Sequence, residues 1–148
     1  MNEVKISPIT QNDIEAIVLL EEKCFSVPWS YSSLQFEIAN ENSIFLCAKK
    51  NEEVLGYAGM HIAADEGYID NIAVFEKHRK KGIASFLINE LIDYALIKKL
   101  AFISLEVRIS NLPAIKLYNK FGFIKAGIRK GFYEFPKEDA VIMTKKFI

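Results

Sequence analysis

The chain has 148 residues, of which 51% are hydrophobic and 26% charged, with 19 basic and 19 acidic side chains. This composition predicts one folded domain, residues 1–148, and excludes an intrinsically disordered chain. The balanced charge argues against a nucleic-acid binder, and the short apolar runs argue against a membrane span. Cys24 and Cys47 lack metal-type spacing, so we expect reduced core thiols, no metal site and a cytoplasmic protein.

Hydrophobic periodicity predicts the following elements in chain order. They are a strand at 4–9, helices at 10–25 and 30–38, strands at 44–49, 54–62 and 68–74, a helix at 82–98, a strand at 102–107, a helix at 111–121, and strands at 123–128 and 140–147. Gly56 and Gly59 predict a bulge or a close backbone contact in the third strand. Three consecutive strands followed by strand–helix–strand crossovers predict an α+β fold in α/β/α layers. The expected sheet is mixed, has about seven strands and carries helices on both faces.

A basic, glycine-containing turn follows the strand that ends with Asn71-Ile72-Ala73-Val74. Arg79-Lys80-Lys81 precedes Gly82, and apolar residues recur at helical spacing from Ile83 onward. The turn therefore places backbone N–H groups and the positive end of a helix dipole beside cationic side chains, which favours a bound phosphate or pyrophosphate. Gly82 lets the backbone approach the anion closely, because it has no Cβ. A basic turn before a helix is common, so this pattern alone does not establish such a site.

A second candidate site follows the apolar strand at 103–107, which contains Glu106. A carboxylate there is either solvated or ion-paired with Arg108, or it lies in a cleft with a raised pKa. Asn111 is a good N-cap for the next helix, and Tyr118, two helical turns on, faces the same way. Together, Glu106, Asn111 and Tyr118 offer a base, a polar anchor and a weak acid, which fits acyl transfer to an amine.

Several other residues have two interpretations from the sequence. Trp29, in Pro28-Trp29-Ser30, either shapes a loop over an acceptor peptide or anchors the turn between two helices. Phe132 and Tyr133 either line a peptide groove or close the final hairpin. His61 and His78 are expected to be surface or turn residues rather than catalytic groups.

The motifs occur in an order and at spacings that resemble one family. They are Asn71-Ile72-Ala73-Val74, Arg79-x-x-Gly82-x-Ala84, Leu105-Glu106-Val107-Arg108 with Asn111, Ala114-Ile115, Leu117-Tyr118 and Phe121-Gly122-Phe123. This set resembles the GNAT family of N-acetyltransferases. Phe25-x-x-Pro28-Trp29-Ser30 and Lys137-Glu138-Asp139-Ala140 are similar to the ribosomal-protein-alanine N-acetyltransferases within it. The resemblance covers nearly the whole chain.

The resemblance implies a GNAT fold that uses acetyl-CoA as co-substrate. It implies that Glu106 is the proton acceptor and that Tyr118 is the proton donor to the CoA sulfur. We expect Trp29 and Tyr133 to bind the substrate. The cofactor-binding residues that the resemblance implies are Ile72, Ala73, Val74, Arg79, Lys80, Lys81, Gly82, Ile83, Ala84, Ser85, Asn111 and Tyr118. Ala84 stands where many relatives carry glycine, and Gly131-Phe132-Tyr133 stands where relatives tend to have Asn-Tyr-Tyr, which bears on peptide specificity.

The implied reaction is direct acetyl transfer, in a ternary complex, to the α-amino group of an N-terminal alanine, on small-subunit ribosomal protein eighteen. The implied partner is the N-terminal peptide of that protein, with no nucleic acid or membrane, and we expect a monomer or a weak dimer. Two alternatives stay open from the sequence. One is a GNAT enzyme for another amine, such as a Lys side chain, a polyamine or an antibiotic. The other is a non-catalytic acetyl-CoA-binding module.

Overall fold

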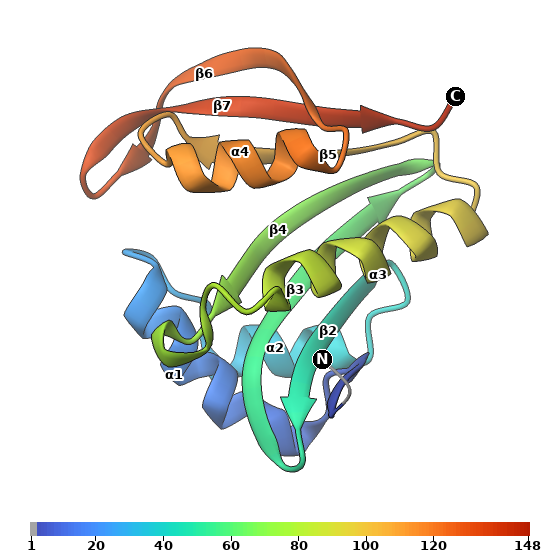
Figure 1. The fold of residues 1–148 in the computed structure, drawn as a ribbon, viewed down its shortest axis with the longest axis vertical. Helices are drawn as coiled ribbons and strands as arrows, with labels where there is room; N and C mark the ends of the chain where they lie inside the picture. Colours follow the sequence, from blue (N-terminus) through green and yellow to red (C-terminus); the bar gives the residue numbers. More distant parts are fainter. Residues whose placement is uncertain (1–2) are drawn as a thin grey trace.

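The computed structural model describes residues 3–148, which form a seven-stranded sheet with helices on both of its faces (Figure 1). The helices are α1 (Ile14–Cys24), α2 (Tyr31–Ile38), α3 (Ile83–Ile97) and α4 (Leu112–Lys120), with short 3-10 turns at Gln11–Asp13 and Glu76–His78. The strands are β1 (Val4–Pro8), β2 (Ser43–Lys50), β3 (Glu53–Ala63), β4 (Glu66–Val74), β5 (Phe102–Arg108), β6 (Ile124–Glu134) and β7 (Lys137–Lys146). In the described part of the chain, no helix has the length and apolar character that crossing a membrane requires.

The strands lie in the order β1-β2-β3-β4-β5-β7-β6, and every neighbouring pair is antiparallel except β4 and β5. The parallel pair arises because α3 connects β4 to β5 as a crossover. The α+β fold class, the mixed sheet and the helices on both faces are therefore confirmed.

Two apolar cores, one on each face of the sheet, hold the helices in place. Side chains of α3 such as Leu87 and Leu91 are fully buried with Met60 of the sheet. On the opposite face, α1 and α2 cover a second core that contains Phe45 and Tyr57. Burial of each large apolar side chain contributes about 1.5–3 kcal/mol, so the alternation along β2 and β3 orients the sheet between the two helix layers.

The parallel strands β4 and β5 separate after a short paired segment. Their ladder joins Glu66–Ile69 to Phe102–Leu105 and ends there, while β4 continues to Val74 and β5 to Arg108. Figure 1 shows the two strands side by side on the right and well apart on the left. The register between β3 and β4 also shifts here, because Gly59 pairs with Asn71 but Met60 pairs with Ile69. Asp70 is therefore the extra residue of a β-bulge.

The close contact predicted for β3 is confirmed, whereas the bounds predicted for the last two strands are too short. A Cβ at Gly56 would lie 2.7 Å from the Ala73 carbonyl oxygen, so the expected close backbone contact in β3 is confirmed. The last two strands are longer than predicted: β6 continues to Glu134 and β7 begins at Lys137. Most β6 side chains are exposed, so the strand lacks the apolar alternation that marks a half-buried strand in a sequence.

Candidate active site

A cleft of about 850 Å³ lies where β4 ends and α3 and α4 begin. It is lined by Lys23, Cys24, Phe25, Ile72, Ala73, Val74, His78, Arg79, Lys80, Gly82, Ile83, Ala84, Ser85, Asn111, Pro113, Ala114, Leu117 and Tyr118. All but one of the sequence-predicted cofactor residues line this cleft. The exception is Lys81, which lines a neighbouring cavity with Lys50 and His78.

The N-terminus of α3 presents, at one end of the cleft, backbone N–H groups that make no hydrogen bond to residues 3–148. Gly82 is the N-cap with φ +84°, and the first helical bond runs from the Phe86 N–H to the Gly82 carbonyl at 3.0 Å. The N–H groups of Ile83, Ala84 and Ser85 therefore have no acceptor within the helix. A Cβ at Gly82 would meet nothing within 4 Å, so the glycine is needed for its left-handed backbone rather than for space against the protein.

Arg79 fixes the turn that precedes α3. Its Nε atom donates to the Val74 carbonyl at 2.9 Å, and Nη2 lies 3.4 Å from Sγ of Cys24. These contacts tie the basic turn to the end of β4 and to the end of α1.

Cys24 is half-buried in the cleft wall rather than in the core, whereas Cys47 is fully buried. Burial, with the nearby Asp13 carboxylate, raises the pKa of the Cys47 thiol to about 12.

Helix α4 supplies the opposite wall of the cleft. The Asn111 side chain caps the helix, since its Oδ1 accepts the Ala114 N–H at 3.2 Å. The Tyr118 ring packs edge-on against Phe123 with 5.8 Å between ring centroids. Burial, with a smaller contribution from Tyr133, raises the pKa of Tyr118 to about 12. The Tyr118 hydroxyl therefore keeps its proton throughout the neutral range, as a proton donor must.

Glu106 lies on the opposite face of β5 from this cleft. Its neighbours Leu105 and Val107 belong to the core beneath α3 and α4, so alternation directs Glu106 to the α1/α2 face. Its carboxylate lies 3.8 Å from Nε of Arg129. The pairing with Arg108 considered from the sequence is wrong, because Arg108 pairs with Glu138 at 3.2 Å.

The two substrate-binding candidates also lie outside the cofactor cleft. Tyr133 stacks on the Arg108 guanidinium at 4.3 Å, and burial and Glu106 raise its pKa. The Trp29 ring packs on Phe45 at 5.4 Å between ring centroids, and the backbone N–H of Trp29 donates to Oε1 of Glu21 at 2.8 Å.

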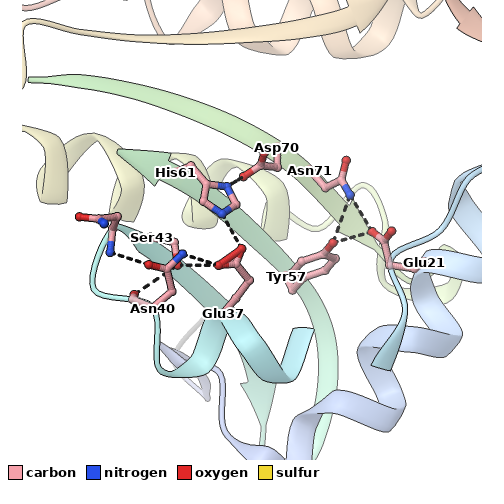
Figure 2. A network of polar contacts seen from close by, with 9 residues as sticks. Glu21, Glu37, Asn40, Ser43, Tyr57, His61, Asp70 and Asn71 are labelled. Carbon is pink, nitrogen blue, oxygen red and sulfur yellow. Dashed lines mark hydrogen bonds and ion pairs between the residues drawn. The ribbon is translucent and has the colours of Figure 1, made fainter. Parts of the chain in front are cut away.

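A polar network on the α1/α2 face was missed in the sequence (Figure 2). It has two separate parts: one joins Glu21, Tyr57 and Asn71, and the other joins Glu37, Asn40, Ser43, His61 and Asp70. The buried Glu21 carboxylate accepts hydrogen bonds from the Tyr57 hydroxyl at 2.5 Å and from Nδ2 of Asn71 at 3.0 Å. Burial raises the pKa of Glu21, although these donors and the Trp29 N–H oppose the shift. His61 was expected at the surface or in a turn and instead lies on β3 within this network.

The model of the acetyltransferase (GNAT) family matches residues 14–123, which is most of the chain. The chain belongs to the GNAT family of acetyltransferases. It is 32% identical over 143 residues to the ribosomal protein bS18-alanine N-acetyltransferase of Escherichia coli, covering 94% of this chain and 95% of that protein. It is 34% identical over 144 residues to the protein of the same name from Haemophilus influenzae, covering 94% and 96% of the two chains.

The crystal structure of the ribosomal-protein-S18-alanine N-acetyltransferase from Escherichia coli superposes on this GNAT chain with a TM-score of 0.88 and 30% identity. The superposition covers 97% of this chain and 93% of the other. The family membership and the fold together make the protein an N-acetyltransferase, as its motifs predicted.

Proposed function

We propose that this GNAT enzyme transfers an acetyl group from acetyl-CoA to the α-amino group of the N-terminal alanine of ribosomal protein bS18. The observation that carries the proposal is the gap between β4 and β5, which separates a cleft with free N–H donors from a carboxylate on the other face. The names of the related enzymes from Escherichia coli and Haemophilus influenzae support this choice of acceptor.

The cleft suits acetyl-CoA in size and in chemistry. The N–H groups of Ile83, Ala84 and Ser85 point from a helix N-terminus beside Arg79 and Lys80, a combination that binds a pyrophosphate. The backbone of 72–74, beyond the end of the parallel ladder, would bind the pantetheine arm. Acetyl-CoA, when bound, supplies an acetyl group activated as a thioester.

Glu106 and Tyr118 approach the gap from opposite faces, and we assign them opposite proton transfers. An α-ammonium group has a pKa near 8, so Glu106 has only to take up one proton, directly or through a water molecule. Tyr118 lines the cofactor cleft and keeps its hydroxyl proton at neutral pH, so it can donate to the departing sulfur. The transfer then needs no covalent acetyl-enzyme.

The acceptor peptide would enter on the α1/α2 face, which carries Glu106. Trp29 on the α1–α2 connection and Tyr133 on the β6–β7 hairpin both lie outside the cofactor cleft, and we assign them to the two sides of the peptide path. The partner would thus be the N-terminal peptide of a ribosomal protein, met in the cytoplasm by a monomer or a weak dimer.

The direct test is release of free CoA with acetyl-CoA and a short peptide that begins Ala-Arg. Two matched peptides serve as controls, one with its N-terminus blocked and one blocked peptide with an internal Lys. We expect turnover with the free α-amine alone. Turnover with the blocked Lys peptide would show that lysine side chains are acceptors. Turnover with none of the peptides would contradict the proposal.

A further inference from the structure

Three side chains, Glu37, His61 and Asp70, form a continuous line across the α1/α2 face (Figure 2). Nδ1 of His61 lies 2.5 Å from Oδ2 of Asp70, and Nε2 contacts Oε2 of Glu37. Each ring nitrogen faces a carboxylate oxygen, so both nitrogens donate when the imidazole is protonated. Burial alone would lower the pKa of His61, but Asp70 and Glu37 outweigh burial and raise it.

The His61 ring is fixed in one orientation by its surroundings. Glu37 is buried, and its Oε1 atom accepts hydrogen bonds from Nδ2 of Asn40 at 2.7 Å and from Oγ of Ser43 at 3.3 Å. The Trp29 indole stacks on the imidazole with 6.1 Å between ring centroids. With one nitrogen bound to Glu37 and one ring face covered, the other nitrogen holds Asp70 in a single position.

Asp70 lies beside Glu106 where the two parallel strands separate. Ile69 and Leu105 form the last pair of the β4–β5 ladder, and Asp70 and Glu106 are the next residues on their strands. Ile69 belongs to the core beneath α3, so alternation directs Asp70 to the α1/α2 face, where His61 contacts it, and Glu106 lies on the same face. Burial raises the pKa of Asp70, His61 opposes this shift, and Glu37 and Glu106 add to it, so the Asp70 and Glu106 carboxylates interact.

We propose that Asp70 is a second acceptor-binding carboxylate, that its Oδ1 atom accepts an N–H from the substrate ammonium, and that His61 positions it. Oδ2 is engaged by His61, and Oδ1 makes no hydrogen bond to the described residues. The inference rests on the proposed function and adds its substrate class, a primary amine that binds in its protonated form. One N–H bond then breaks as an O–H bond forms on Glu106, which leaves the nitrogen lone pair available for acyl transfer. Asp70 keeps the hydrogen bond that it accepts from a second N–H of the amine.

The first arm of the test compares Asp70→Asn with Asp65→Asn, which removes an exposed carboxylate from the β3–β4 turn. A hydrogen bond to a charged group is strong, so Asp70→Asn should raise the KM for the Ala-Arg peptide by about 10-fold or more. The KM for acetyl-CoA should not change, and Asp65→Asn should leave both constants unchanged.

A desamino peptide, with the α-amino group replaced by hydrogen, separates binding of the ammonium from general distortion. Used as a competitive inhibitor, it should bind wild-type enzyme and Asp70→Asn equally well, because it offers nothing to Oδ1. A parallel loss of affinity for the desamino peptide would overturn the proposal, as would a peptide KM for Asp70→Asn no higher than for Asp65→Asn.

The second arm tests the positioning role of His61. The variant His61→Gln should raise the peptide KM less than Asp70→Asn does, and the double variant should resemble Asp70→Asn, since His61 acts through that carboxylate. The groups that set the titration of His61 are Glu37 on α2 and Asp70 on β4. The ratio of the peptide KM values of His61→Gln and wild type should therefore fall toward one as pH rises and wild-type His61 loses its proton. A ratio independent of pH would contradict this role.

Failure of the proposed function is distinguishable from failure of this inference. If wild-type enzyme ignores the Ala-Arg peptide but acetylates a lysine peptide or spermidine, the bS18 proposal fails and the Asp70 comparison is made with that amine. Wild-type enzyme that acetylates no amine would overturn both proposals.

Discussion

The two faces of the β4–β5 gap are built in different ways. On the α3/α4 face, the cleft is lined by residues of two segments, 72–85 and 111–118, together with the end of α1. On the α1/α2 face, charged side chains come from α2, β3, β4 and β5, and are brought together by the sheet. A site made from one turn and one helix start has a local sequence pattern, whereas a site assembled across strands has none.

The largest effect is expected from a substitution on the α1/α2 face, at Glu106. General base catalysis contributes about 10²–10⁴-fold, so Glu106→Gln should lower kcat by at least about 10²-fold. Binding of acetyl-CoA, measured by calorimetry, should be unchanged because Glu106 does not line that cleft. Glu15→Gln, an exposed change on α1, is the control. A wild-type kcat in Glu106→Gln would show that Glu106 is not the general base.

The next effect is expected on the opposite side of the gap. Tyr118→Phe removes the hydroxyl but keeps the ring that packs on Phe123, so folding should be retained and kcat should fall by about 10²-fold, the lower end of the range for general acid catalysis. Tyr94→Phe on α3, outside the cleft, should have no effect on turnover. Retention of wild-type kcat by Tyr118→Phe would show that another group protonates the sulfur.

A change in the turn before α3 should affect the cofactor side alone. Gly82 has φ +84°, a region that costs other residues about 1–2 kcal/mol, so Gly82→Ala should weaken acetyl-CoA binding by about 5–30-fold. Gly127→Ala is the matched control, because its new Cβ would meet only Ile142 at an ordinary 3.8 Å. Equal Kd values for acetyl-CoA in the two variants would contradict a role for this backbone in binding.

The smallest expected effect is on stability, through His61. Its pKa is raised in the folded protein, so its ion pairs contribute fully below the unfolded value near 6.5 and are lost as pH rises through the folded value. The Tm difference between wild type and His61→Gln should therefore be larger at pH 6 than at pH 9. A difference that grows with pH would mean that His61 is buried neutral.

The residues that the sequence predicts for the cofactor side, apart from Lys81, line one cleft, because they lie in order along a few short segments of the chain. The run from Ile72 to Ser85 shows a strand, a basic turn and a helix start, and Asn111 and Tyr118 share one helix face. The Glu37–His61–Asp70 line could not be predicted, because its side chains come from α2, β3 and β4 and only the folded sheet brings them together. The length of β6 was also missed, since its exposed side chains carry no alternation.

The most direct test of the central claim is a crystal structure with a bisubstrate analogue in which CoA is joined through its acetyl group to the α-nitrogen of an Ala-Arg peptide. The account predicts that the CoA arm fills the cleft between β4 and α4, and that the peptide leaves the gap on the α1/α2 face. The linked nitrogen should then lie beside Glu106 and Asp70. A peptide that leaves on the α3/α4 face, or a nitrogen remote from both carboxylates, would contradict it.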